Sequence, residues 1–395
     1  MLDCVIAGGR LVPDGRLISR LADDLAGGQL AALGPRPANR GDLLGLLAGV
    51  SDGRPGQGRD HPVAAVLALA AAAVVAGSRS FTAVAGWAAD VPAGVLAYLY
   101  RRCGARRPGA GPPSKATIWR VVTGADTGAL DAVIGAWLMQ RAAAAGSLAG
   151  AGDGGDDEVP LIPVRVDGKT VRGARNPDGT QVHLLAALAG VPGVIAGQVE
   201  VGAKTNEIPM IIPLLDGVDL GQAVVTADAL HCQRATADYL HRRGADFILP
   251  AKDNQPGLFD ALDALPWHQA PVTHAATDRG HGRIETRTIQ VLPAPGDLPF
   301  PHVSQAYLIE RHVTALDGTP LSDVAALESL HWLRDTLYRE DQSQARTRSG
   351  PRAMAALRNL AVGALHLAGR HDTTEATRWA SRYMDRPFTI LGLTS

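Results

Sequence analysis

Two patterns of apolar residues divide the chain. Before residue 142, apolar residues recur at helical spacing in segments bounded by Pro, Gly, Ser or Thr. These segments predict helices at 43–47, 61–76, 81–89, 95–102, 114–122 and 130–144. After residue 158, short β-branched runs alternate with helical candidates near 206–215 and 233–243. The runs predict strands at 161–166, 182–188, 194–201, 224–227 and 247–250, so this part reads as an α/β domain.

The segment between the two patterns has a different composition. Residues 142–158, AAAAGSLAGAGDGGDDE, are small and glycine-rich, and end in a run of acids. Such a segment buries little apolar surface, so we interpret it as a linker. The expected organisation is a small all-helical domain at 1–141, a linker at 142–158 and an α/β domain at 159–395.

Composition indicates an ordinary globular protein. Hydrophobic residues make up 46% and charged residues 19%, with a net charge of −1, which excludes wholesale disorder. The three cysteines form no CxxC pair, and an odd number gives no disulfide framework, so a reducing cytoplasmic setting is expected. The chain opens without the basic run of a secretory signal. Its most apolar segment, 63–77, is shorter than the roughly 20 residues that a membrane span needs, so we expect a buried helix there and no membrane partner.

Positive charge is concentrated in two regions. Between Val91 and Ala125 there is no acidic residue. The basic residues of this region are Arg101, Arg102, Arg106, Arg107, Lys115 and Arg120. Between Gln342 and Arg386, eight arginines stand against three acids. Both regions are typical of phosphate binding, although solvated helix faces explain either one equally well. The predicted helix that begins at Ser114 could likewise lie against DNA or serve as scaffold.

Two aspartates stand where predicted strands end. Asp167 follows the run 162–166 and Asp228 follows the run 224–227. Ligands of open α/β sheets bind beyond the carboxyl ends of the strands, and two carboxylates on neighbouring strands can share divalent cations there. Each aspartate alone would fit a turn or helix cap; as a pair they favour a metal site.

Other catalytic motifs are missing. GlyLysThr at 168–170 is not a phosphate loop, because Pro163 stands where that motif needs glycine, and the chain has no HExxH, GxSxG or GxGxxG. Only four of the 38 basic residues other than histidine are lysines. Three of these lie near predicted strand ends, where a compact ammonium could contact phosphate or carboxylate: Lys169, Lys204 and Lys252.

A series of motifs spans nearly the whole chain. In order, they are VDGKTVRGAR (166–175), VHLLAAL, VGAKTNEIP, VVTADALHCQ, GADFILPAKDNQP, HGRIETR, LESLHWLRDTLYRED and PRAMAALRNLAVGAL. Together they strongly resemble the DDE transposases of bacterial insertion sequences, and most of all the ISAs-type, or H-repeat-associated, subgroup. The helical segment before residue 142 is similar to the N-terminal part of that family.

The resemblance implies a fold and a chemistry. The fold is a ribonuclease-H-like mixed sheet flanked by helices, with a β-rich insertion at about 255–321. Asp167, Asp228 and Glu328 match the three acidic residues that hold Mg²⁺ or Mn²⁺. The implied activity is metal-dependent cleavage and strand transfer at insertion-sequence ends, because two cations can stabilise an in-line displacement at phosphorus. The implied partners are double-stranded DNA, at transposon ends and target, and a second copy of the chain, in the bacterial cytoplasm and nucleoid.

The chain departs from the family just before the glutamate. Residues 314–327 replace a longer segment, so a helix carrying Glu328 would have to begin within them, with Ser322 or Asp323 as its cap. Asp335 would lie on the same helix face as Glu328 and is the rival ligand. The alternative function is therefore a disabled remnant that only binds DNA. A metal-dependent phosphatase would explain the aspartates but neither basic region.

Further residues are candidates for contact with DNA. They are Lys169, Lys204, Lys252, Arg283, Arg287, Arg346 and Arg348. Arg283, Glu285 and Arg287 alternate on one face of a predicted strand, which fits either a DNA contact or a ladder of ion pairs across strands. His231 either orients a ligand near Asp228 or is a packed helix histidine.

Overall fold

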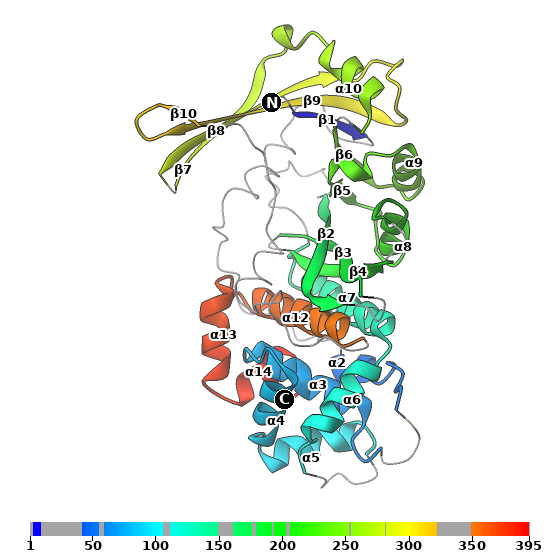
Figure 1. The fold of residues 1–395 in the computed structure, drawn as a ribbon, viewed down its shortest axis with the longest axis vertical. Coiled ribbons are helices and arrows are strands. Elements are labelled where there is room, and N and C mark those ends of the chain that lie inside the picture. Colours follow the sequence, from blue (N-terminus) through cyan, green and yellow to red (C-terminus); the bar gives the residue numbers. More distant parts are fainter. Residues whose placement is uncertain are drawn as a thin grey trace. The chain divides into compact units, whose positions relative to one another are not determined.

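The chain forms two units, each assembled from segments that are distant in sequence. A computed structural model describes residues 3–8, 42–54, 59–105, 111–148, 161–175, 179–191, 193–202, 206–252, 254–280, 282–321 and 349–394 (Figure 1). The first unit comprises Met1–Ala31, Ala149–Asp167 and Glu207–Ser329. The second comprises Ala32–Leu148, Gly168–Asn206 and Leu330–Ser395. Of the predicted linker, residues 149–158 lie outside the described residues and residues 142–144 end the helix Thr127–Ala144, so the predicted domain boundaries remain a prediction.

The first unit is built on a mixed sheet. Its strands are the start of β2 (Ile162–Arg175), then β5 (Ala223–Ala227), β6 (Asp246–Ala251), β1 (Asp3–Gly8), β9 (Val303–Ala315), β8 (Arg283–Pro293) and β7 (Val272–Gly280), in this spatial order. The short β10 (Pro320–Leu321) pairs with β9. β2, β5 and β6 are parallel, whereas the neighbours from β6 through β1 to β7 are antiparallel. The strands β7 to β10 are the predicted β-rich insertion.

Short helices connect these strands. They are η1 (Ile208–Met210), α8 (Ile211–Leu215), η2 (Ala229–His231), α9 (Arg234–Arg242), α10 (Pro256–Asp263) and η3 (Trp267–Gln269). The hydrophobic pattern did not predict β1, whose residues Cys4 to Ala7 are nearly inaccessible to solvent. This strand lies between β6 and β9 and hydrogen-bonds to both, so the N-terminus is part of the sheet and not of the helical region.

The second unit consists mainly of helices. They are α2 (Leu43–Leu47), α3 (Val63–Val75), α4 (Phe81–Ala89), α5 (Ala93–Arg102), α6 (Lys115–Gly124), α7 (Thr127–Ala144), α12 (Gly350–Leu367), α13 (Thr373–Ser381) and α14 (Asp385–Ile390). The strands β3 (Gln181–Ala189) and β4 (Val194–Val201) continue outward from β2 in the order β4-β3-β2. Ser80, Ser114 and Asp126 cap α4, α6 and α7 by accepting a backbone N–H bond.

The order in which strands β2 to β6 pair agrees with the predicted ribonuclease-H-like sheet. β2 pairs with β3 and β5, β3 pairs with β4, and β5 pairs with β6. The mixed sheet flanked by helices, with Asp167 on its first strand and Asp228 just after its fourth, counted from β2, confirms the ribonuclease-H-like fold class.

Helix α3 is the centre of the helical core. Every residue from Ala64 to Val75 is buried, among α2, α4, α6 and α12 (Figure 1). The prediction of a buried helix here is confirmed. In the described ranges, no single helix has both the length and the apolar character to cross a membrane; only α4 and α5 taken together pass that test, and they are bent by 108°.

Helix α7 packs closely against β4. A Cβ atom added to Gly135 would lie 2.3 Å from the carbonyl oxygen of Ala196 on β4, so only glycine allows this approach. Buried polar groups fix the same contact: Gln198 donates to Asp131 at 3.1 Å, and Asn359 of α12 donates to Gln198 at 2.9 Å. A buried polar network with a defined set of partners specifies one arrangement of the elements around it.

Two helical glycines offer a matched test of this packing. Gly135→Ala should lower the free energy of unfolding by about 1–3 kcal/mol, because the new methyl group must displace β4. Gly86→Ala on α4 meets nothing within 4 Å and should raise it by about 0.5–1 kcal/mol, because alanine is the better helix former. Urea unfolding followed by circular dichroism measures both. Equal effects from the two substitutions would contradict the close approach.

Candidate active site

The parallel pairing of β2 with β5 brings Asp167 and Asp228 together. Asp228 directly follows β5, as predicted, but β2 continues through Asp167 to Arg175, so the prediction that the first strand ends at residue 166 is wrong. The register runs from Ile162 opposite Ala223 to Val166 opposite Ala227. Asp167 and Asp228 each follow the last paired residue, and both are exposed. Since neighbouring strands lie about 4.8 Å apart, the two aspartates occupy adjacent backbone positions where the pairing of β2 with β5 ends. Both residues belong to the first unit.

The backbone after β5 orients the Asp228 carboxylate. Asp228 is extended, with φ −64° and ψ 160°, and is the N-cap of η2. Its Oδ1 accepts a hydrogen bond from the backbone N–H of Ala229 at 2.5 Å. Within the described part of the chain, Oδ2 has no hydrogen-bond partner. One carboxylate oxygen is therefore held by the backbone, whereas the other makes no hydrogen bond to the described residues.

The segment 228–233, hereafter the Asp228 loop, is held by the segment that follows β6. Asn254 Nδ2 donates to the carbonyl of Ala229 at 2.6 Å. Gln255 Nε2 donates to the carbonyl of Cys232 at 2.9 Å. These two amides, from the KDNQ motif, were not singled out from the sequence; their position next to a predicted strand end was the available signal.

His231 points inward from the same loop. The residue is 1% exposed, and its Nε2 lies 3.3 Å from Oε2 of Glu207. Of the two sequence interpretations, its burial fits the packed histidine. Glu207, from the TNEIP motif, was not predicted as a site residue.

The thiol next to this histidine is chemically inert. Burial raises the pKa of Cys232 to about 12, so almost no thiolate exists at neutral pH. None of the three cysteines forms a disulfide.

The third predicted ligand, Glu328, lies outside the described residues, as do Ser322, Asp323 and Asp335. The structure does limit how the chain reaches it: β9 ends at Ala315, and a turn leads to β10, which ends at Leu321. A helix carrying Glu328 must therefore begin after Leu321. Within the described ranges, no group of three His, Cys, Asp or Glu side chains could hold a metal ion.

The first basic region lies on the second unit. Arg101, at the end of α5, and Lys115 and Arg120, on α6, are exposed. Arg102 donates to Asp42 at 2.7 Å. Arg106 and Arg107 lie outside the described residues. The exposed residues of the first basic region therefore lie on α5 and α6.

The other predicted DNA contacts differ in exposure. Lys252, after β6, and Arg283, at the start of β8, are exposed. Lys169 on β2 is buried, at 7% exposure. Lys204, Arg346 and Arg348 lie outside the described residues.

Further arginines are used inside the second unit. Arg352 donates to Asp131 at 3.0 Å, and Arg358 is 1% exposed. The guanidinium groups of Arg370 and Arg386 lie 3.5 and 4.2 Å from the Trp379 ring centroid. Several arginines of the second basic region therefore make ion-pair, cation–π or buried contacts within the second unit.

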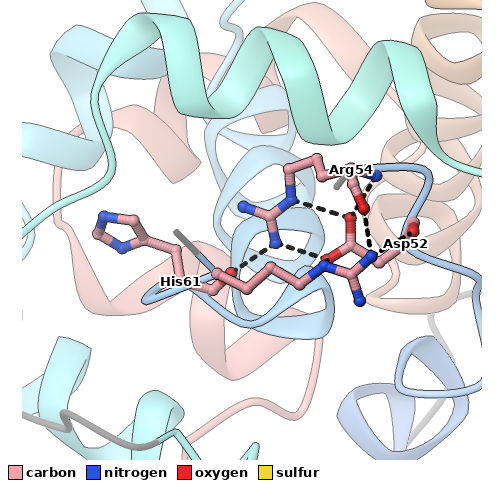
Figure 2. Close-up of polar contacts among 4 residues, drawn as sticks. Asp52, Arg54 and His61 are labelled. Carbon is pink, nitrogen blue, oxygen red and sulfur yellow. Dashed lines mark hydrogen bonds and ion pairs between the residues drawn. The ribbon is translucent and has the colours of Figure 1, made fainter. Parts of the chain in front are cut away.

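Arg54 also serves the fold. Its Nε and Nη2 donate to the two Asp52 oxygens at 2.8 and 2.7 Å, and Nη2 also donates to the His61 carbonyl at 2.8 Å (Figure 2). The Arg54 hydrogen bond lowers the pKa of Asp52. The backbone of Asp52 also forms a β-bridge with Ala125, at the end of α6. The ion pair therefore stabilises the start of the helical region.

On the insertion, Glu285 forms an ion-pair ladder with two arginines. It accepts from Arg311 at 2.6 and 2.7 Å and pairs with Arg287. These arginines, with the Arg311 hydrogen bond first, lower the pKa of Glu285 to about 2. The ladder is the second of the two sequence interpretations for this strand, and Arg283 stands exposed at its end.

This ladder predicts a pH dependence of stability. The pKa of Glu285 is depressed in the folded protein, so its contribution is complete above its usual value of 4.5 and is lost as the pH falls toward about 2. Glu285→Gln should lower stability at pH 7 by about 2–4 kcal/mol. Urea unfolding at several pH values should show the difference between parent and variant shrinking below pH 4.5. A difference that does not change with pH would contradict the pairing.

Two family models match separate stretches of the chain. Residues 44–138 match the family model described as DDE_Tnp_1-associated, and residues 163–319 match the model of the transposase DDE domain. The "Uncharacterized protein in dhlA 3'region" of Xanthobacter autotrophicus is 33% identical over 236 residues, covering 58% of this chain and 73% of that protein. "Putative transposase YncI" of Escherichia coli K12 is 30% identical over 188 residues, covering 45% of this chain and 68% of that protein.

Two further similarities are weaker. "H repeat-associated putative transposase YhhI" of Escherichia coli K12 is 22% identical over 242 residues, covering 51% of this chain and 63% of that protein. The solved piggyBac transposase synaptic complex with hairpin DNA aligns with a TM-score of 0.34 and 10% identity, over 98% of this chain and 83% of that one.

The fold and the paired aspartates define a ribonuclease-H-like protein with two aspartates next to each other where the pairing of β2 with β5 ends. Together with the family matches, they identify the chain as a member of the DDE transposase family. The resemblance predicted from its motifs is confirmed.

Proposed function

We propose that this transposase cleaves DNA at insertion-sequence ends and transfers the freed strand to target DNA, with Mg²⁺ or Mn²⁺ as cofactor. The observation that carries the proposal is the register of β2 and β5, which sets Asp167 beside Asp228. Its place of action would be the bacterial nucleoid in the cytoplasm, where its substrate is found.

The described residues fit a hard divalent cation. Asp167 and Asp228 offer exposed carboxylate oxygens, the ligand type that Mg²⁺ and Mn²⁺ prefer. They would hold the metal together with Glu328. When bound, such cations activate the attacking oxygen and neutralise charge on the scissile phosphate.

The protein's own groups would position the reactants. The Ala229 N–H holds Oδ1 of Asp228 and leaves Oδ2 to face the cation. Lys252 stands exposed on the segment that also carries Asn254 and Gln255, and this segment leaves the sheet at the edge where β5 ends. Its ammonium would contact a DNA phosphate near the aspartates.

Replacing one aspartate should separate cleavage from binding. Asp167→Asn keeps the shape but removes an anionic ligand, so Mg²⁺-dependent nicking of DNA carrying the element's ends should fall below about one hundredth of the parent rate. DNA affinity, measured by gel shift, should stay within about twofold, because phosphate contacts supply most of it.

Asp263→Asn, an exposed aspartate on α10, is the matched control and should nick normally. Equal loss of binding and nicking in Asp167→Asn would show a structural role for that residue. A parent that binds the ends but never nicks would favour the DNA-binding remnant.

DNA affinity is proposed to come from the first basic region, with two copies of the chain bringing two ends together. Replacing Arg106, Arg107 and Lys115 with glutamine should reduce the slope of log affinity against log salt by about 0.9 for each phosphate that the variant no longer binds. The control is Arg242→Gln, an exposed arginine on α9. An unchanged slope in the triple variant would remove this surface from the DNA interface.

A further inference from the structure

The buried His231 of the Asp228 loop contacts the partly buried Glu207. Glu207 is the N-cap residue of η1, and His231 ends η2. A carboxylate can only accept, so Nε2 of His231 carries the proton in the 3.3 Å contact with Glu207 Oε2. Both residues belong to the first unit, as Asp228 does.

His231 is tied to Asp228 at two levels. Its backbone N–H donates to the carbonyl of Asp228 at 2.9 Å and closes the η2 turn. Its ring, 1% exposed, fixes the far side of that turn against Glu207. The Asn254 bond to Ala229 holds the turn from another side. Releasing the ring would let η2 shift, and the Asp228 carboxylate with it.

A histidine is an unexpected choice for packing alone. Its Nδ1 is buried and has no hydrogen-bond partner among the residues that the structure describes. A buried polar atom without a partner destabilises a fold, whereas an apolar side chain would fill the same space without that cost. The His231 ring therefore has one buried nitrogen, Nδ1, that lacks a described partner and destabilises the fold. Its other nitrogen, Nε2, contacts Glu207.

We propose that Glu207 and His231 are positioning residues for the cation ligand Asp228: their contact holds the η2 turn so that Asp228 Oδ2 stays directed to the metal. This inference rests on the proposed function, since it concerns the cation assigned to Asp167 and Asp228. Groups that orient a metal ligand in this way commonly affect metal affinity by 10–100-fold.

The test is direct Mn²⁺ binding to the full chain, followed by electron paramagnetic resonance, with the thermal unfolding midpoint recorded for every variant. Asp167→Asn defines which part of the signal belongs to this site. His231→Ala should raise the Kd for Mn²⁺ about tenfold or more. Glu207→Ala, a change at a less buried residue, should do the same and keeps the test valid if His231→Ala does not fold.

Two variants separate positioning from stability. His231→Gln can place its amide N–H near the position of Nε2, so it should restore the Kd to within about threefold of the parent value. Asp216→Ala removes the acceptor of the Tyr239 hydroxyl, a 2.9 Å bond elsewhere in the same unit. It should lower the unfolding midpoint and leave the Kd unchanged.

The outcomes distinguish the two proposals. Parent protein that binds Mn²⁺, with folded His231→Ala and Glu207→Ala variants that bind it equally well, would overturn the positioning role alone. If Asp216→Ala weakened Mn²⁺ binding as much as His231→Ala does, the positioning role would also be overturned, because general destabilisation of the fold would then explain both effects. Parent protein that binds no Mn²⁺ at Asp167 would overturn the proposed function and the inference with it.

Discussion

The register between two parallel strands is the constraint on which the candidate site depends. Val166 pairs with Ala227, so the next residue on each strand is an aspartate. A shift of one residue in either strand would move its side chains to the opposite face of the sheet and separate the carboxylates. The pairing lies in the core of the first unit, because Val164, Val166, Val224 and Val225 are all nearly inaccessible to solvent.

Around that pairing, hydrogen bonds from other segments fix the loop that carries Asp228. Asn254 and Gln255 bind its carbonyls, and Glu207 binds His231. The two aspartates remain exposed while their surroundings are buried or bonded. Rigid support beneath exposed ligands is what a site needs if it must hold a cation in one geometry.

The sequence allowed the two aspartates and the strands before them to be predicted, because β-branched runs mark strands independently of their partners. It did not give the end of β2, which continues past Asp167 to Arg175. Strand β1 escaped prediction, since the six residues DCVIAG become a strand only by pairing with residues more than 200 positions away. The roles of Glu207 and Asn254 escaped for the same reason: their partners are distant in sequence. Charge in the sequence was also a weak guide to the DNA-binding residues. Arg352 and Arg358 belong to the second basic region, but Arg352 is paired with Asp131 and Arg358 is buried.

The most direct measurement of the central claim is a crystal structure of the full chain soaked in Mn²⁺, with the metal located by its anomalous scattering. We expect an anomalous peak within bonding distance of carboxylate oxygens from both Asp167 and Asp228, and no such peak in Asp228→Asn crystals. A Mn²⁺ ion bound elsewhere, with the two aspartates bare or pointing apart, would contradict the assignment of this sheet edge as the active site.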